Sequence, residues 1–147
     1  CARRSVQRAP RSDYIGMAQS FVGLVSVLVP CYDAAIEYYC DSLGFHLVQD
    51  DRVSPEKRWV VVKPDPLAEC GLLLAKAAND AQSAHIGQQT GGRVFLYLFT
   101  DDFHSTYYAF LDRGVEFLEI PRHEPYGRVA KFQDKFGNIW DLLEKPN

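Results

Sequence analysis

Hydrophobic and polar positions follow the same order in two stretches of the chain. The first stretch has an alternating, β-branched run over residues 22–29, which predicts a strand. A helical period follows over residues 32–43, Gly44 suits the end of that helix, and residues 45–50 predict a second strand. The same order returns around Gly114, which lies 70 residues after Gly44. Because a long period inside a small chain indicates duplicated modules, we expect two copies of one unit.

The remaining segments complete each unit. In the first unit, residues 58–63 and 71–75 predict two more strands. The second unit has predicted strands at 93–99, 115–120, 127–133 and 138–144, and a helix that buries Phe103, Tyr107, Phe110 and Leu111. The sequence therefore predicts an α+β fold of two βαβββ modules, whose curved mixed sheets surround a cleft. The expected divisions are an N-terminal tail (1–20), the first module (21–76), a linker (77–92) and the second module (93–147), within one domain.

The first sixteen residues differ in composition from the rest of the chain. They carry four arginines against the single acidic residue Asp13, and the only methionine, Met17, directly precedes the first strand-like run. This arrangement favours natural translation from Met17, with residues 1–16 as non-native sequence. The alternative is a transit peptide, which is also rich in arginine and poor in acidic residues.

Charge and cysteine content exclude several functions. The net charge is −3 and the body after the tail is acidic, so the basic stripe of a nucleic-acid-binding protein is absent. No apolar run approaches the roughly 18 residues of a membrane span, so we expect no membrane partner. None of the four cysteines forms a C-x-x-C pair, which argues against a zinc site and fits reduced thiols in a cytoplasmic protein.

Several motifs then resemble a known superfamily. The first module carries Val29-x-x-x-Asp33-x-Ala35-Ile36-x-Tyr38-Tyr39, closed by Leu43-Gly44-Phe45. The second carries Gly91-Gly92, Thr100-Asp101-Asp102-Phe103, Gly114-Val115-Glu116-Phe117, Pro121-Arg122, Pro125-Tyr126-Gly127 and Asp134-x-x-Gly137-Asn138-x-Trp140-Asp141-Leu142. Together these segments resemble the vicinal oxygen chelate superfamily over about residues 21–145. That superfamily contains glyoxalase I, bleomycin resistance proteins, fosfomycin resistance enzymes and extradiol dioxygenases.

The resemblance also implies where a metal would bind. In the superfamily's enzymes, three or four His, Glu or Gln side chains from four strands hold a divalent ion. The matching positions here are Leu24, Val94 or Phe95, the segment 71–74, and Asp141, and only Asp141 carries a donor. One carboxylate does not hold a catalytic ion, so we expect neither a metal nor another cofactor. The histidines lack ligand spacing to one another; they are His46, His85, His104 and His123.

Asp141 is the strongest candidate for a functional residue. Strand alternation places it on the face opposite Trp140, where we expect a carboxylate within an apolar cavity. It would pair with a cationic ligand or with a protein arginine, namely Arg58, Arg122 or Arg128, because a buried lone carboxylate is costly. The candidate ligand-binding residues are Asp141, Tyr97, Phe99, Trp59, Arg122, Tyr126 and Phe132.

The leading functional hypothesis is a metal-free protein that binds a small, partly apolar or cationic molecule, similar to the bleomycin resistance branch. The alternative is a lyase, isomerase or dioxygenase of the same superfamily, with or without a metal. A third hypothesis is an interaction module whose cleft is filled by its own side chains. The resemblance also implies a homodimer, because members of the superfamily often dimerise.

Overall fold

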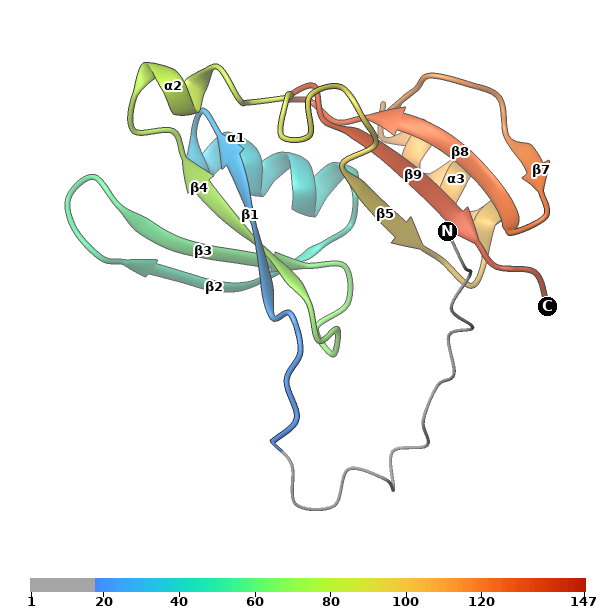
Figure 1. Ribbon diagram of the computed structural model, residues 1–147, viewed down its shortest axis with the longest axis horizontal. Helices are drawn as coiled ribbons and strands as arrows, with labels where there is room; N and C mark the ends of the chain where they lie inside the picture. The colour runs from blue at the N-terminus through green and yellow to red at the C-terminus, as the bar shows by residue number, and fades with distance from the viewer. Residues whose placement is uncertain (1–17) are drawn as a thin grey trace, which may run out of the picture.

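The computed structural model describes residues 18–147, so the expectations about residues 1–16 lie outside the described part of the chain. Two sheets lie side by side, and each is built from one half of the chain (Figure 1). The α+β fold with two mixed sheets that the sequence predicts is confirmed.

The first sheet has four strands in the order β1-β4-β3-β2. The strands are β1 (Leu24–Val29), β2 (His46–Arg52), β3 (Arg58–Lys63) and β4 (Gly71–Lys76). β1 pairs in parallel with β4, whereas the β2–β3 and β3–β4 pairs are antiparallel. The first strand of the module is therefore hydrogen-bonded to the last one.

The second sheet repeats this arrangement with one addition. Its order is β5-β9-β8-β6, and β7 pairs with the beginning of β8, whereas β6 pairs with its end. The strands are β5 (Leu96–Phe99), β6 (Glu116–Phe117), β7 (Arg122–Glu124), β8 (Gly127–Gln133) and β9 (Ile139–Glu144). The strand expected over 115–120 is shorter than predicted, because Pro121 interrupts the segment and the chain pairs with β8 again only from Arg122.

Helices cover one face of each sheet (Figure 1). α1 (Tyr32–Glu37) continues as the π-helical turn η2 (Tyr38–Ser42), so the helix predicted over 32–43 has the expected extent but widens in its second half. Gly44 follows with a φ of 71°, as the helix stop requires. α3 (Phe103–Asp112) begins at the cap Asp102, whose side chain accepts the Ser105 N–H at 3.0 Å. The linker contains one further short helix, α2 (Asp80–Ser83).

One continuous core joins the helix-covered faces of both sheets. β1, β3 and β4 contribute valines and leucines, and the second module contributes the rings of Phe103, Phe110, Phe132 and Trp140. Trp140 connects the modules, because its ring lies 6.2 Å from the Tyr39 ring and 6.0 Å from the Phe45 ring. The two modules are therefore held together through α1, η2 and the start of β9.

A buried carboxylate strengthens this connection. Asp134, which is 4% exposed, lies in the turn between β8 and β9. Its Oδ2 accepts the Tyr39 hydroxyl at 2.7 Å, the Asn138 Nδ2 at 2.9 Å and the Trp140 Nε1 at 3.1 Å. Its Oδ1 accepts the backbone N–H groups of Phe136 at 2.9 Å and Asn138 at 3.0 Å. We call these five hydrogen bonds the Asp134 cluster.

Among residues 18–147, no helix has the length and apolar character needed to cross a lipid bilayer.

Candidate functional site

Asp141 lies in the middle of β9, between β5 and β8. It is opposite Tyr97 on one side and opposite Lys131 on the other. Strand alternation turns Trp140 and Leu142 into the core, so Asp141 and Leu143 lie on the face away from the helices. The Asp141 side chain is 9% exposed, and its Oδ1 is buried without a hydrogen-bond partner among residues 18–147. In the described part of the chain, the cation paired with it is the Lys131 ammonium at 3.8 Å, which is too far for a hydrogen bond.

The expectation that an arginine pairs with Asp141 is wrong, because all three candidate arginines have other partners. Arg58 binds Asp33 and Asp50, on its own module, at 2.7 and 2.6 Å. The guanidinium of Arg128 stacks on the Phe103 ring at 4.7 Å, on the opposite face of the sheet. The third candidate, Arg122, bonds to side chains of its own loop and strand.

Three exposed aromatic side chains surround this carboxylate. Tyr97 is 56% exposed, Phe99 is 54% exposed and Tyr126 is 50% exposed. With Asp141 they line a pocket of about 440 Å³, which we call the β5–β9 pocket; its other lining residues are Leu143 and Lys145. The pocket therefore combines an apolar aromatic wall with a carboxylate that lacks hydrogen bonds.

Lys145 was absent from the sequence prediction, although strand alternation from Asp141 through Leu143 leads to it. Its ammonium lies 5.0 Å from the centroid of the Phe99 ring. This is the geometry of a cation–π contact, so the wall of the pocket attracts a positive charge. Lys145 is exposed, so a ligand can displace its side chain.

The other candidate residues lie in different places. Arg122 supports the pocket indirectly, because its Nη1 donates to the Tyr126 hydroxyl at 3.1 Å. Phe132 is fully buried and stacks on Trp140 at 5.7 Å, so it belongs to the core on the opposite face. Trp59 lies on β3 of the first sheet and lines a different cavity. The structure therefore brings together Asp141, Tyr97, Phe99 and Tyr126, and it separates Trp59 and Phe132 from them.

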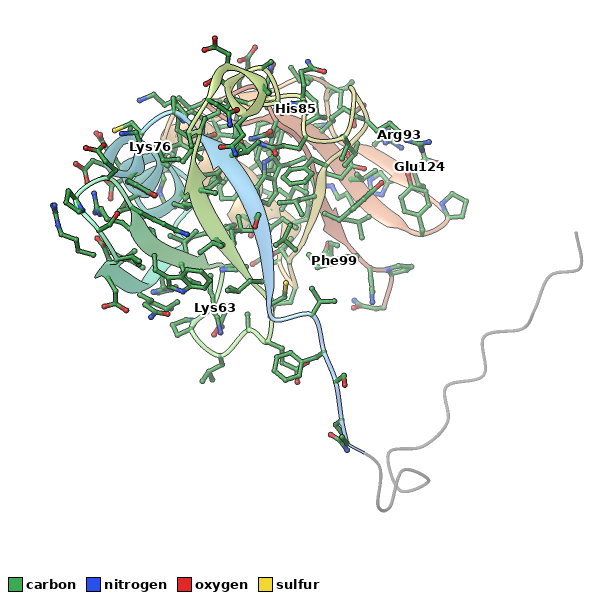
Figure 2. All side chains as sticks on the ribbon, turned by 60° about the vertical axis from the view of Figure 1, so that its left-hand side comes forward. Lys63, Lys76, His85, Arg93, Phe99 and Glu124 are labelled. Atoms are coloured by element: carbon green, nitrogen blue, oxygen red, sulfur yellow. The ribbon has the colours of Figure 1, made fainter. Side chains whose placement is uncertain are left out.

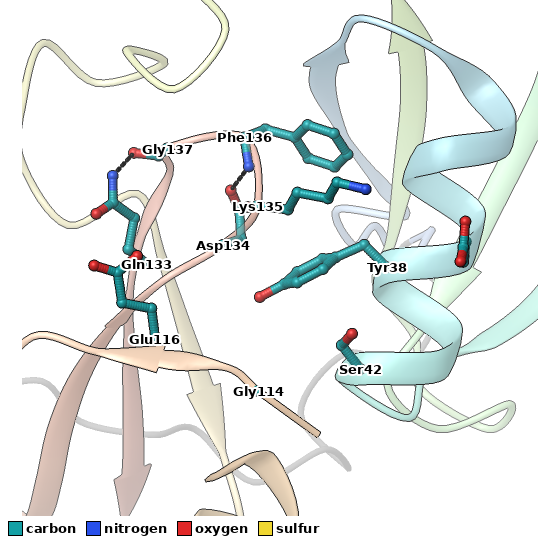
Figure 3. Close-up of a pocket in the computed structure, with 10 residues that line it drawn as sticks. Tyr38, Ser42, Gly114, Glu116, Gln133, Asp134, Lys135, Phe136 and Gly137 are labelled. Atoms are coloured by element: carbon teal, nitrogen blue, oxygen red, sulfur yellow. Dashed lines mark hydrogen bonds between the residues drawn. The ribbon is translucent and has the colours of Figure 1, made fainter. Parts of the chain in front are cut away.

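A larger polar pocket of about 650 Å³ lies between η2 and the β8–β9 turn, and sequence reasoning missed it (Figure 3). The Tyr38 side chain points into the space between the modules, and its hydroxyl is buried without a hydrogen-bond partner in residues 18–147. Burial, and then the negative charge of Asp134, raise the pKa of Tyr38 above its ordinary value. Asp134 itself faces the core through the Asp134 cluster, so the turn beside this pocket serves first to join the modules.

The residues do not fit the metal site of the superfamily's enzymes. Leu24 is paired with Gly71 in the first sheet, and neither has a donor side chain. Phe95 precedes β5 and packs against the core. Within residues 18–147, no three His, Cys, Asp or Glu side chains come together as a metal site requires. Asp141 is thus the only donor among the matching positions.

Comparison with known proteins identifies the family. The model of the Glyoxalase/Bleomycin resistance protein/Dioxygenase superfamily matches residues 21–142. The chain belongs to this superfamily. The resemblance inferred from the motifs is thus confirmed.

Three similar proteins show how far the likeness extends along the chain. A protein of Shewanella frigidimarina, named only as uncharacterized, is 44% identical over 129 residues, which are 87% of this chain and 95% of that protein. The crystal structure of TnmS3, an antibiotic binding protein from Streptomyces sp. CB03234, is 31% identical with a TM-score of 0.72. That similarity covers 88% of this chain and 99% of TnmS3. The crystal structure of UcmS2 is 25% identical with a TM-score of 0.74, over 86% of this chain and 98% of UcmS2.

Proposed function

We propose that this protein binds a small, partly apolar molecule with a cationic group in the β5–β9 pocket, and sequesters it without a metal. The observation that carries the proposal is Asp141, a buried carboxylate beside three half-exposed aromatic rings, whose Oδ1 accepts no hydrogen bond from the part of the chain that the structure describes. A buried polar group without a partner is costly, so a ligand that donates a hydrogen bond to Asp141 would gain affinity there.

The position of Lys145 shows that the Phe99 ring accepts an ammonium group. Its ammonium already lies over the Phe99 ring, so a ligand's ammonium or flat cationic ring would take the same place. The similarity to TnmS3 supports small-molecule binding, since that protein is described as antibiotic binding and covers nearly all of this chain. An enzyme of the same superfamily is the alternative, and it would need donors that Leu24 and Phe95 do not supply.

The proposal includes a homodimer in the cytoplasm. Large apolar side chains on the sheet faces away from the helices are exposed, Leu24 by 37% and Phe99 by 54%. A second copy that covers these faces would enclose the β5–β9 pocket, which is open on one side in a single chain. Sedimentation equilibrium tests this expectation directly, and a monomer at micromolar concentration would contradict it.

The binding test uses proflavine, a flat aromatic cation, and 9-hydroxymethylanthracene, a neutral molecule with three similar rings. We expect calorimetry to detect proflavine binding, which the Asp141→Asn variant should weaken about tenfold to a hundredfold, since a hydrogen bond to a charged group contributes about 1.5–3 kcal/mol. The neutral molecule should bind both proteins equally. Asp112→Asn removes one exposed negative charge elsewhere on the surface and is the matched control.

Two results would count against the proposal. Equal proflavine affinity for wild type and Asp141→Asn would show that the carboxylate does not bind the ligand. Strong thermal stabilisation by Mn²⁺, Ni²⁺, Zn²⁺ or Fe²⁺, without any response to the organic probes, would favour the metal-dependent enzyme.

A further inference from the structure

The first sheet divides at one end into two separate pairs of strands. β3 and β4 are paired from Val62↔Leu72 to Val60↔Leu74, and no further. Beyond that point β4 stays with β1 as far as Val29↔Lys76, and β3 stays with β2 as far as Arg52↔Arg58. The β2–β3 hairpin therefore diverges from the β1–β4 pair, as Figure 1 shows. We call the space between the two pairs the β3–β4 fork.

Contacts with α1 hold the fork open. The Arg58 N–H, at the start of β3, is donated to the Tyr32 hydroxyl at 3.2 Å instead of to β4. The Arg58 guanidinium lies 5.3 Å from the Tyr32 ring and bonds to Asp33 and Asp50. The start of β3 is thus tied to α1 and to β2 by several bonds at once. The fork is therefore formed before any ligand arrives, which lowers the entropic cost of binding.

The fork contains a cavity of about 590 Å³, which is within the size range of small-molecule sites, roughly 300–1,000 Å³. Its wall is mostly apolar: Leu74 is fully buried, Tyr32 is 9% exposed, and Trp59 is half-buried. Trp59 and Tyr32 provide aromatic rings on two different elements, β3 and α1. A flat ring system that enters the cavity would lie between these two elements.

The charges at the rim indicate the polar group of such a ligand. Lys57 and Lys76 line the cavity, are exposed and form no ion pair with any other residue in the described chain. The charge of Arg58 is already matched by two carboxylates, so it adds little. Glu56 is the one acidic side chain in the lining. Two free ammonium groups against one carboxylate favour an anion.

We propose that the β3–β4 fork is a second small-molecule site, which takes a flat aromatic molecule carrying an acidic group. It is separate from the β5–β9 pocket: Lys76, at the rim of the fork, and Phe99, in the pocket, lie far apart on the molecule (Figure 2). The two sites differ in preferred charge, because one has a carboxylate without a hydrogen bond among the described residues and the other has two ammonium groups outside any ion pair there. The proposal does not depend on the function of the β5–β9 pocket.

The test uses 1-anilinonaphthalene-8-sulfonate and the uncharged N-phenyl-1-naphthylamine, which has the same rings. The two tryptophans report the location, since Trp59 lines the fork and Trp140 is buried in the core at 3% exposure. In ¹H–¹⁵N NMR spectra, the sulfonate probe should shift the indole N–H signal of Trp59 and leave that of Trp140 in place. The sulfonate should also bind more tightly than the uncharged probe.

Two variants test the charge and the volume. Lys76→Glu should weaken the sulfonate probe about threefold to tenfold and leave the uncharged probe unchanged, as expected for an exposed charge pair. Lys135→Glu, the same change on the β8–β9 turn, is the matched control and should have no effect. Ala75→Phe places a ring in the cavity and should abolish binding of both probes, with folding checked by the Trp140 signal.

Three outcomes would overturn the proposal. The probe could shift only residues of the β5–β9 pocket, such as Tyr97, and not Trp59. Lys76→Glu and Lys135→Glu could weaken it equally, which would indicate general electrostatic attraction. The Trp59 signal could instead shift with protein concentration and without any probe, which would make the fork an interface between copies of the chain.

Discussion

Removing the Asp134 carboxylate should destabilise the fold far more than removing any exposed carboxylate. Asp134→Ala leaves three buried side-chain donors and two backbone N–H groups without their acceptor. Each buried donor left unsatisfied costs about 1–3 kcal/mol, and water that enters the new space recovers part of this. We therefore expect a loss of about 4–6 kcal/mol, which is close to the whole stability of a marginal domain.

Two smaller changes divide this loss. Tyr39→Phe removes one donor to the charged Oδ2 and should cost about 1.5–3 kcal/mol. Asp134→Asn keeps the Oδ1 acceptor for the two backbone N–H groups and replaces Oδ2 by an amide donor. Its loss of stability should therefore fall between those of Tyr39→Phe and Asp134→Ala. Because Tyr39 and Asp134 are in direct contact, the effects of Tyr39→Phe and Asp134→Asn should not add when combined.

Urea unfolding followed by circular dichroism gives the free energies of unfolding. A Trp59→Phe background leaves Trp140 as the only tryptophan, and its indole donates to Asp134, so fluorescence then reports on the cluster itself. Asp112→Ala, on the exposed end of α3, is the control and should change stability by less than about 0.5 kcal/mol. An Asp134→Ala protein within about 1 kcal/mol of wild type would refute the reasoning, because five lost hydrogen bonds cannot be so inexpensive.

Three further predictions concern other parts of the fold. Gly127→Ala should be much more destabilising than Gly114→Ala in urea unfolding. Both glycines have positive φ, but a Cβ at Gly127 would collide with the Glu144 carbonyl, whereas Gly114 faces open space. Gly114→Ala should therefore cost only about 1–2 kcal/mol. Burial, and then the charge of Asp134, raise the pKa of Tyr39 in the folded protein. The stabilisation by the Tyr39 hydroxyl is therefore complete below pH 10 and is lost as the pH rises through the higher folded pKa. The urea midpoint should fall at alkaline pH, and it should fall less in Tyr39→Phe. Lys145→Met frees the Phe99 ring and should raise the affinity for proflavine in calorimetry, whereas a lower affinity would show that this ammonium helps binding.

The sequence predicted the modules well, because their strands and helices have strong local signals. The apolar run ending at Val29, the helical period after it and the glycine stops at Gly44 and Gly114 are each readable within about ten residues. Interruptions were harder to foresee. The π-helical turn at the end of the first helix depends on what packs against it, which no local pattern shows.

The candidate site was predicted only in part for a similar reason. Alternation along β9 correctly separated Asp141 from Trp140, because side-chain direction in a strand follows from position alone. The partner of Asp141 could not be predicted, since any arginine was compatible with the sequence and only the register of β8 selects Lys131. The bond between Tyr39 and Asp134 joins residues 95 positions apart, and a turn motif cannot reveal its distant donor.

In the described residues, strands pair only with strands of the same module. The first strand of each module is paired with the last one, β1 with β4 and β5 with β9. The linker between the two modules contributes no strand to either sheet. Its length can therefore be changed in engineered variants. Gly87 is fixed, because its Cβ would lie 2.5 Å from the Phe136 carbonyl, but Gly91 and Gly92 have nothing within 4 Å. New termini made by circular permutation, or an inserted reporter domain, belong between those two glycines. Doubling the length of a loop there would cost only about 0.6 kcal/mol.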